Sequence, residues 1–127
     1  MSRAVLDASA VLAVLQSEPG ADRVLALEDK PCISAVNYAE VLSKLLHGGL
    51  EETAMKQRIL QVASEVLPFD EAQAHACAVL RPLTRVHGLS LGDRACLALA
   101  QSLKLPVLTA DKAWARLKIG VKIEVIR

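Results

Sequence analysis

RAVLDASAVLAVL, at residues 3–15, is the stretch from which the fold is predicted. A short apolar run, residues 3–6, ends at Asp7, and residues 10–16 are then rich in good helix formers. This order predicts a strand, an acidic residue at the carboxyl end of that strand, and a helix.

The remaining sequence repeats this alternation of short strands and helices. Strands are predicted at residues 3–6, 32–34, 66–69, 106–108 and 121–126. Helices are predicted at residues 10–16, 21–28, 36–47, from about 50, 70–86, 93–103 and 112–117. Helices between strands require crossover connections, so we expect an α/β fold with a mostly parallel five-stranded sheet flanked by helices on both faces. Pro68 limits its strand to an edge or an end of the sheet.

The composition indicates one globular domain over residues 1–127. The chain is 53% hydrophobic, which excludes a disordered protein, and its length suffices for one compact core. Aromatic residues make up only 2%, too few for a nucleic-acid module that stacks bases on several rings. No apolar run approaches the length of a membrane span, so no membrane partner is expected.

Three cysteines, Cys32, Cys77 and Cys96, lie far apart in the sequence, without a C-x-x-C pair or a neighbouring histidine. This spacing argues against zinc. Their apolar neighbours and odd number predict buried, reduced thiols in a cytoplasmic protein.

The net charge of +1 is unevenly distributed. Residues 112–127 carry five basic residues against Glu124 alone, a balance of +4, whereas residues 1–111 carry ten basic and thirteen acidic residues, a balance of −3. Lys112 and Arg116 are four residues apart on a predicted helix. Two interpretations fit them equally well, namely that they bind phosphates or that they form an ordinary solvated face. Trp114, between them, is expected to be a packing anchor.

Four acidic residues lack an obvious surface role. Asp7 and Asp111 follow predicted strands, Asp93 begins an almost wholly apolar helix, and Glu40 lies inside a helix next to apolar residues. Taken singly, three have a simpler interpretation: Asp7 and Asp111 as helix N-caps, and Asp93 in a capping box with Ser90. Together, the positions of the four acids predict that they lie at one rim of a parallel sheet, where ligands bind outside the carboxyl ends of the strands.

A pocket of four carboxylates needs a cation. Two unit charges about 4 Å apart at an effective dielectric constant of about 20 repel by about 4 kcal/mol. Mg²⁺ and Mn²⁺ take oxygen ligands and bind through carboxylates together with substrate phosphates, and no His or Cys stands beside these acids. An all-carboxylate pocket of this kind suits metal-assisted phosphodiester hydrolysis.

Four motifs carry a resemblance to a known family. They are VLDAS at residues 5–9, NYAEVLSK at 37–44, SLGDRACLALA at 90–100 and TADKAW at 109–114. In this order, over nearly the whole chain, they resemble the PIN domain, and the chain length is similar to that of the VapC toxins of bacterial toxin–antitoxin pairs. The resemblance implies a single PIN-like nuclease domain, a Mg²⁺- or Mn²⁺-dependent endoribonuclease.

The resemblance also implies roles for individual residues and partners. Asp7, Glu40, Asp93 and Asp111 match the family's catalytic and metal-binding acids, and Asp111 matches the position that varies. Ser9 and Thr109 match its supporting small polar positions. Arg94 stands where many relatives have a small residue, and we expect it, like Lys112 and Arg116, to bind RNA phosphates. A cognate antitoxin protein, an RNA substrate and a homodimer are the implied partners.

Two other functions fit the same acids. One is a phosphoryl-transfer domain with Asp7 as the aspartyl nucleophile, although Ser9 stands where a dehalogenase-type site requires a second acid. The other is a non-catalytic module whose acidic pocket receives a basic segment of a partner.

Overall fold

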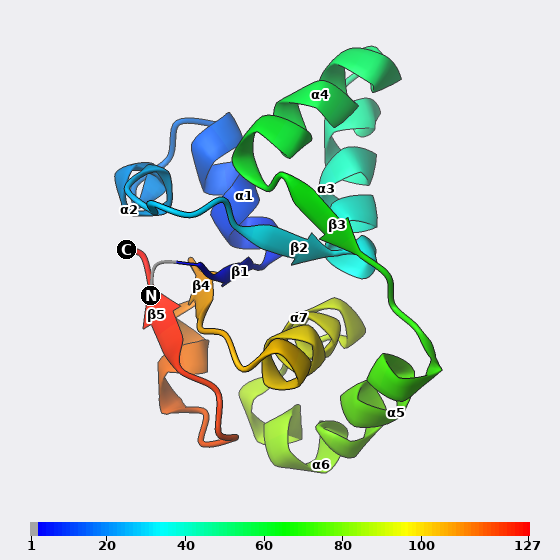
Figure 1. Ribbon diagram of the computed structural model, residues 1–127, viewed down its shortest axis with the longest axis vertical. Helices are drawn as coiled ribbons and strands as arrows, with labels where there is room; N and C mark the ends of the chain where they lie inside the picture. Colours follow the sequence, from blue (N-terminus) through cyan, green and yellow to red (C-terminus); the bar gives the residue numbers. More distant parts are fainter. Residues whose placement is uncertain (1–2) are drawn as a thin grey trace.

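Five parallel strands form one sheet with the strand order β3-β2-β1-β4-β5 (Figure 1). The computed structural model describes residues 3–127, so residues 1 and 2 of the predicted domain lie outside the described part. The strands are β1 (Val5–Leu6), β2 (Cys32–Ser34), β3 (Glu65–Leu67), β4 (Val107–Thr109) and β5 (Ile123–Val125). The predicted α/β fold is confirmed, with every pair of neighbouring strands parallel.

Helices cover both faces of the sheet (Figure 1). On one face, Leu6, Ile33 and Leu108 pack in a common core with residues of three helices, α1 (Ala8–Leu15), α3 (Ala35–His47) and α4 (Glu52–Val62). The adjacent strand residues Val5, Cys32 and Val107 belong to the core on the opposite face, with α5 (Glu71–Val79) and α7 (Leu91–Leu103). Successive side chains in a strand point to opposite faces, so these short apolar strands supply both cores.

The strand order places a topological switch point between β1 and β4. The chain leaves β1 in one direction, through β2 to the edge strand β3, and returns to β4 on the other side of β1. Crevices at such a point, outside the carboxyl ends of the strands, are where ligands bind in open parallel sheets. Asp7 directly follows β1, and Asp111 follows β4 by two residues.

The predicted long helix over residues 70–86 is wrong in one respect, because it is broken into three pieces. After α5 come α6 (Arg81–Thr84) and a short 3-10 helix, η1 (Arg85–His87). Pro82 has no N–H to continue the α5 hydrogen-bond ladder, and its ring clashes with the carbonyl four residues earlier. Gly88, at φ +70°, then turns the chain toward α7.

Two further helices differ from the prediction. The second helix, α2 (Ala21–Leu25), is shorter than expected and does not reach residue 28. The segment after β4 is a 3-10 helix, η2 (Lys112–Arg116), where an ordinary helix was expected. Trp114, in η2, is completely buried, which confirms its predicted packing role.

The three cysteine thiols are free and buried, as predicted. Burial raises the pKa of Cys96 well above its usual value, so that thiol stays protonated. Within residues 3–127, no helix combines the length and apolar character that crossing a membrane requires.

Candidate active site

The four acids singled out in the sequence line one cleft at the switch point. It has a volume of about 350 Å³ and opens beyond the carboxyl ends of β1 and β4. Its polar and charged lining residues are Asp7, Ser9, Gln16, Glu18, Glu40, Lys44, Asp93, Asp111 and Arg127. A larger cavity, of about 510 Å³, includes Arg3, Arg23 and Glu124, but Arg3 pairs with Glu65 and Arg23 with Glu124. The cleft with the four acids is therefore the better candidate on chemical grounds.

Asp7 is the buried centre of the cleft, with 4% of its surface exposed. Its Oδ1 accepts a hydrogen bond from the Ala10 N–H (2.9 Å) as the N-cap of α1, and its Oδ2 accepts one from Thr109 Oγ1 (2.6 Å). Ser9 Oγ lies 2.7 Å from Oδ1 and 2.9 Å from Oδ2. The two hydroxyls thus fix the carboxylate between β1 and β4.

Burial raises the pKa of Asp7 to about 6, even though the hydrogen bonds from Thr109, Ala10 and Ser9 oppose the shift. The negative charge of Asp93 adds to the increase. No salt bridge in the described residues involves Asp7. At neutral pH the carboxylate is ionised and buried, and no Lys or Arg of residues 3–127 forms an ion pair with it, which is unfavourable for the folded state.

Glu40 lies directly against Gly92 of α7. Asn37, which is buried, donates from Nδ2 to Glu40 Oε1 (2.8 Å) and to the Gly92 carbonyl (3.0 Å). A Cβ atom added at Gly92 would lie 2.5 Å from Glu40 Oε1, closer than atoms in contact can approach. The absence of a side chain at Gly92 is therefore what lets the Glu40 carboxylate reach the first turn of α7.

Asp93 and Asp111 both act as helix caps. Asp93 accepts a hydrogen bond from the Ser90 N–H (3.0 Å) and its own N–H donates to Ser90 Oγ (3.1 Å), the predicted capping box. Asp111 accepts from the Ala113 N–H (2.9 Å) at the start of η2. The predicted capping roles of Asp93 and Asp111 are thus confirmed. Both residues cap a helix and also line the same cleft.

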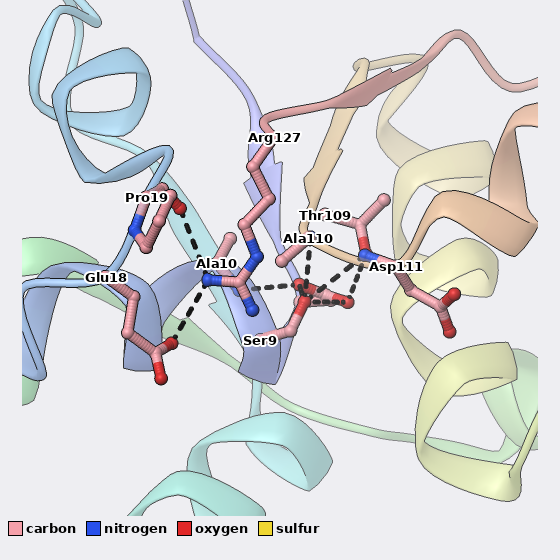
Figure 2. Close-up of polar contacts among 9 residues, drawn as sticks. Ser9, Ala10, Glu18, Pro19, Thr109, Ala110, Asp111 and Arg127 are labelled. Atoms are coloured by element: carbon pink, nitrogen blue, oxygen red, sulfur yellow. Dashed lines mark hydrogen bonds and ion pairs between the residues drawn. The ribbon is translucent and has the colours of Figure 1, made fainter.

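Two cations of the cleft were not predicted from the sequence. Lys44 lies one turn after Glu40 on α3, and the spacing in NYAEVLSK could have indicated this. Arg127 comes from the segment after β5, and its Nη1 donates to Glu18 Oε1 (3.3 Å) and to the Pro19 carbonyl (3.2 Å). Figure 2 shows Ser9 between Arg127 on one side and Thr109 and Asp111 on the other.

The cations predicted to bind phosphate are not in the cleft lining. Lys112 and Arg116 are exposed, but a 3-10 helix has three residues per turn, so positions four apart diverge instead of sharing a face. Arg94 is only 8% exposed, and its Nη1 donates to the Cys77 carbonyl (3.0 Å). The structure therefore does not bring Arg94 to the four acids, although it directly follows Asp93.

The donor chemistry of the cleft fits a hard divalent cation. Only carboxylates, hydroxyls and an amide are available, and oxygen ligands are what Mg²⁺ and Mn²⁺ prefer. An ion would also offset the buried negative charge of Asp7. Each acid is engaged in its own hydrogen bonds, and within residues 3–127 no three His, Cys, Asp or Glu side chains converge on one point. The acids thus share a cleft without forming a preassembled ligand cluster.

The chain is similar to a known family and to several solved structures. The family model of the PIN domain matches residues 4–120. A toxin–antitoxin complex from Klebsiella pneumoniae includes a similar chain, with 25% identity, a TM-score of 0.68, and coverage of 93% of this chain and 94% of that one. VapBC-5 from Mycobacterium tuberculosis is 26% identical with a TM-score of 0.59, covering 100% of this chain and 99% of that one.

A further solved structure supports the fold alone. VapBC-1 from nontypeable Haemophilus influenzae is 19% identical, with a TM-score of 0.70 and 96% of both chains covered. A comparison with curated proteins gives no match.

Proposed function

The chain belongs to the PIN domain family, and from that premise we propose that it is a metal-dependent endoribonuclease, the toxin component of a toxin–antitoxin pair. The observation that carries the proposal is the gathering of four carboxylates from distant parts of the chain around the buried, uncompensated Asp7. The similar chain from Klebsiella pneumoniae is part of a toxin–antitoxin complex, which supports the toxin role.

In the proposed mechanism the protein holds an ion and orients the RNA. Asp7, Glu40 and Asp93 would hold Mg²⁺ or Mn²⁺, and Asp111 would assist. When bound, the ion activates a water molecule and stabilises the leaving oxygen of the phosphodiester. Thr109 and Ser9 keep the Asp7 carboxylate in one orientation by donating hydrogen bonds to it.

Lys44 and Arg127 supply the positive charge that was expected from Lys112 and Arg116. Both line the cleft beside the acids, and Arg127 is held at its place by Glu18 and the Pro19 carbonyl. A phosphate entering a cleft with four carboxylates is repelled unless cations meet its oxygens. We therefore assign phosphate binding in the cleft to these two residues.

An aspartyl-phosphate mechanism is less well supported. A nucleophilic Asp7 needs a free oxygen facing the phosphorus atom. Both oxygens of Asp7 accept hydrogen bonds, and the residue is 4% exposed. The cleft favours Asp7 as a fixed ligand over Asp7 as an attacking group.

The partners implied by the family resemblance are part of the proposal. A cognate antitoxin would block the acidic cleft, and a second copy of the chain would complete a homodimer. Three free, buried cysteines suit the reducing cytoplasm, where we place the protein.

Incubation of the purified protein with single-stranded RNA tests the proposed function. We expect cleavage with added Mn²⁺ or Mg²⁺ and none with excess chelator, because the acids alone cannot activate water. A non-catalytic binding module would bind RNA or a basic peptide under both conditions and leave the RNA intact. Cleavage that persists undiminished in chelator would contradict a metal-dependent mechanism.

Removing the two cleft cations should weaken RNA binding without moving the cleavage position. For Lys44→Ala with Arg127→Ala, measured in chelator, we expect the Kd to rise about tenfold and the salt dependence of log Kd to fall by about 1.4, the value for two phosphate contacts on a single strand. The matched control is Lys112→Ala with Arg116→Ala, which removes the same charge outside the cleft lining. An equal effect of the control pair would return phosphate binding to Lys112 and Arg116.

A further inference from the structure

Besides the acidic cleft and the 510 Å³ cavity, a further cavity of about 370 Å³ lies beside the first turn of α7 and has a basic lining. Three arginines, Arg81, Arg85 and Arg94, surround it together with Ser90, Leu91 and neighbouring loop residues. In the described part of the chain, none of the three arginines forms a salt bridge with a carboxylate. None of the residues that line this cavity also lines the acidic cleft.

The local sequence explains why these arginines meet. Pro82 breaks the long helix, so Arg81 begins α6 and Arg85 begins η1, four residues apart. Gly88, at φ +70°, then folds the chain back so that α7 starts against this segment. Both Arg81 and Arg85 are exposed, whereas Arg94 closes the cavity from the α7 side.

Arg94 is the only one of the three arginines that is buried. It is buried, with an exposed fraction of 8%, and its Nη1 donates to the Cys77 carbonyl near the end of α5. Its buried Nε has no hydrogen-bond partner. A guanidinium buried against a neutral acceptor is costly, and an anion in the adjoining cavity would offset that cost.

The position of the cavity relative to the acidic cleft indicates which anion it takes. Asp93 lines the cleft and Arg94, the next residue on α7, lines the basic cavity. Consecutive helix residues point about 100° apart, so the first turn of α7 separates the two sites. An RNA strand whose cleaved phosphodiester lies in the cleft would place a neighbouring phosphate at the arginines. Because the net charge of the protein is only +1, the attraction for that phosphate has to come from these nearby arginines.

We propose that the Arg81–Arg85–Arg94 cavity is a second phosphate subsite, which holds the RNA backbone next to the bond that is cleaved. This inference rests on the proposed ribonuclease function. Arginine suits the role because its planar guanidinium donates two parallel hydrogen bonds to phosphate oxygens. The subsite adds binding energy to that supplied by Lys44 and Arg127, which line the acidic cleft.

The test is the double variant Arg81→Ala with Arg85→Ala, because both side chains are exposed and their removal leaves the core intact. Binding of a single-stranded RNA decamer is measured in chelator at several salt concentrations, so cleavage does not interfere. We expect the Kd to rise about tenfold and the salt dependence of log Kd to fall by about 1.4. The matched control, Arg116→Ala with Lys118→Ala, removes two exposed charges that line neither cavity.

A dinucleoside monophosphate gives a second control. It has a single phosphate and cannot occupy both sites, so its rate of cleavage with Mn²⁺ should not be lower in Arg81→Ala with Arg85→Ala than in the parent. The Nε–H resonance of Arg94 should shift when the decamer is added and should not shift with a nucleoside, which lacks phosphate.

The outcomes separate this inference from the proposed function. Cleavage of RNA with no change of decamer binding in the arginine variant overturns the subsite and leaves the ribonuclease intact. Weakened decamer binding by a protein that never cleaves supports phosphate binding at the arginines, but it overturns the ribonuclease and with it a role of these arginines beside a cleaved bond. Equal effects of the control pair, Arg116→Ala with Lys118→Ala, also overturn the subsite.

Discussion

Replacing Asp7 by Asn is expected to lower the rate of RNA cleavage by a factor on the order of 10³. The substitution keeps the side-chain volume and one oxygen for the Ala10 N–H, but it removes the buried negative charge that holds the ion. Activity is measured with Mn²⁺ on a defined RNA, and folding is checked by thermal melting.

The matched control is Asp70→Asn. Asp70 caps α5 by accepting a hydrogen bond from the Gln73 N–H (2.9 Å), as Asp7 caps α1, but it does not line the cleft. Asn and Asp are equally good N-caps, so this variant should keep both its stability and its activity. Full activity in Asp7→Asn would leave Asp7 as a helix cap and nothing more.

The same Asp7 variant should also change how stability depends on pH in the absence of metal. The pKa of about 6 in the folded protein lies above the ordinary value of 3.8, so the folded protein binds a proton more tightly than the unfolded chain. The free energy of unfolding therefore falls as the pH rises from about 4, and it levels off above about 6. The pKa difference corresponds to about 3 kcal/mol.

Asp7→Asn removes this titration, so the variant should be at least as stable as the parent above the folded-state pKa of about 6. Its advantage over the parent should shrink as the pH falls toward the unfolded value of 3.8, because the parent's Asp7 then becomes protonated. Chemical denaturation of both proteins in chelator measures the difference, and the other titrating groups cancel in the comparison. A difference that stays constant over this pH range would contradict the raised pKa.

Gly92→Ala is expected to reduce cleavage on the order of 10²-fold while leaving the protein folded. The new Cβ would lie 2.5 Å from Glu40 Oε1, so the flexible end of Glu40 has to move away from Gly92 and out of its present position in the cleft lining. The backbone of α7 has no reason to shift, because Ala is a better helix former than Gly. We expect a melting temperature at or above that of the parent.

Two comparisons isolate the effect of Gly92→Ala. Gly48→Ala makes the same change at the C-cap of α3, where φ is −76° and the nearest contact is an ordinary 3.4 Å, so its activity should be unchanged. In a Glu40→Ala background, Gly92→Ala should have no further effect, because both substitutions act on one carboxylate. Additive losses in that double variant would show that Gly92 acts through another route.

Much of the fold follows from short-range patterns in the sequence. The apolar run before Asp7 predicts β1, Pro68 predicts that β3 lies at the edge of the sheet, and the Ser90–Asp93 pair predicts the start of α7. These signals act over a few residues, through backbone hydrogen bonds and side-chain alternation, so they can be read locally. The acids at the carboxyl ends of parallel strands follow from them.

Errors arise where two local signals compete. The run of Ala residues after Asp70 favours a continuous helix, but Pro82 stops it because a missing N–H outweighs the propensity of its neighbours. The segment with Lys112 and Arg116 has a helical composition, yet it is five residues long and forms a 3-10 helix. That difference separates two side chains that the sequence places on one face.

The tertiary structure alone decides which distant residues complete the site. Arg127 reaches the cleft from the opposite end of the chain to Asp7 because β5 ends beside β4, and Gly92 meets Glu40 because α7 packs against α3. Neither approach leaves a local signature, since the residues involved belong to separate elements whose packing depends on the whole core. The sequence by itself determined the acids and the strands that present them, and packing across the sheet determined which cations and which glycine they meet.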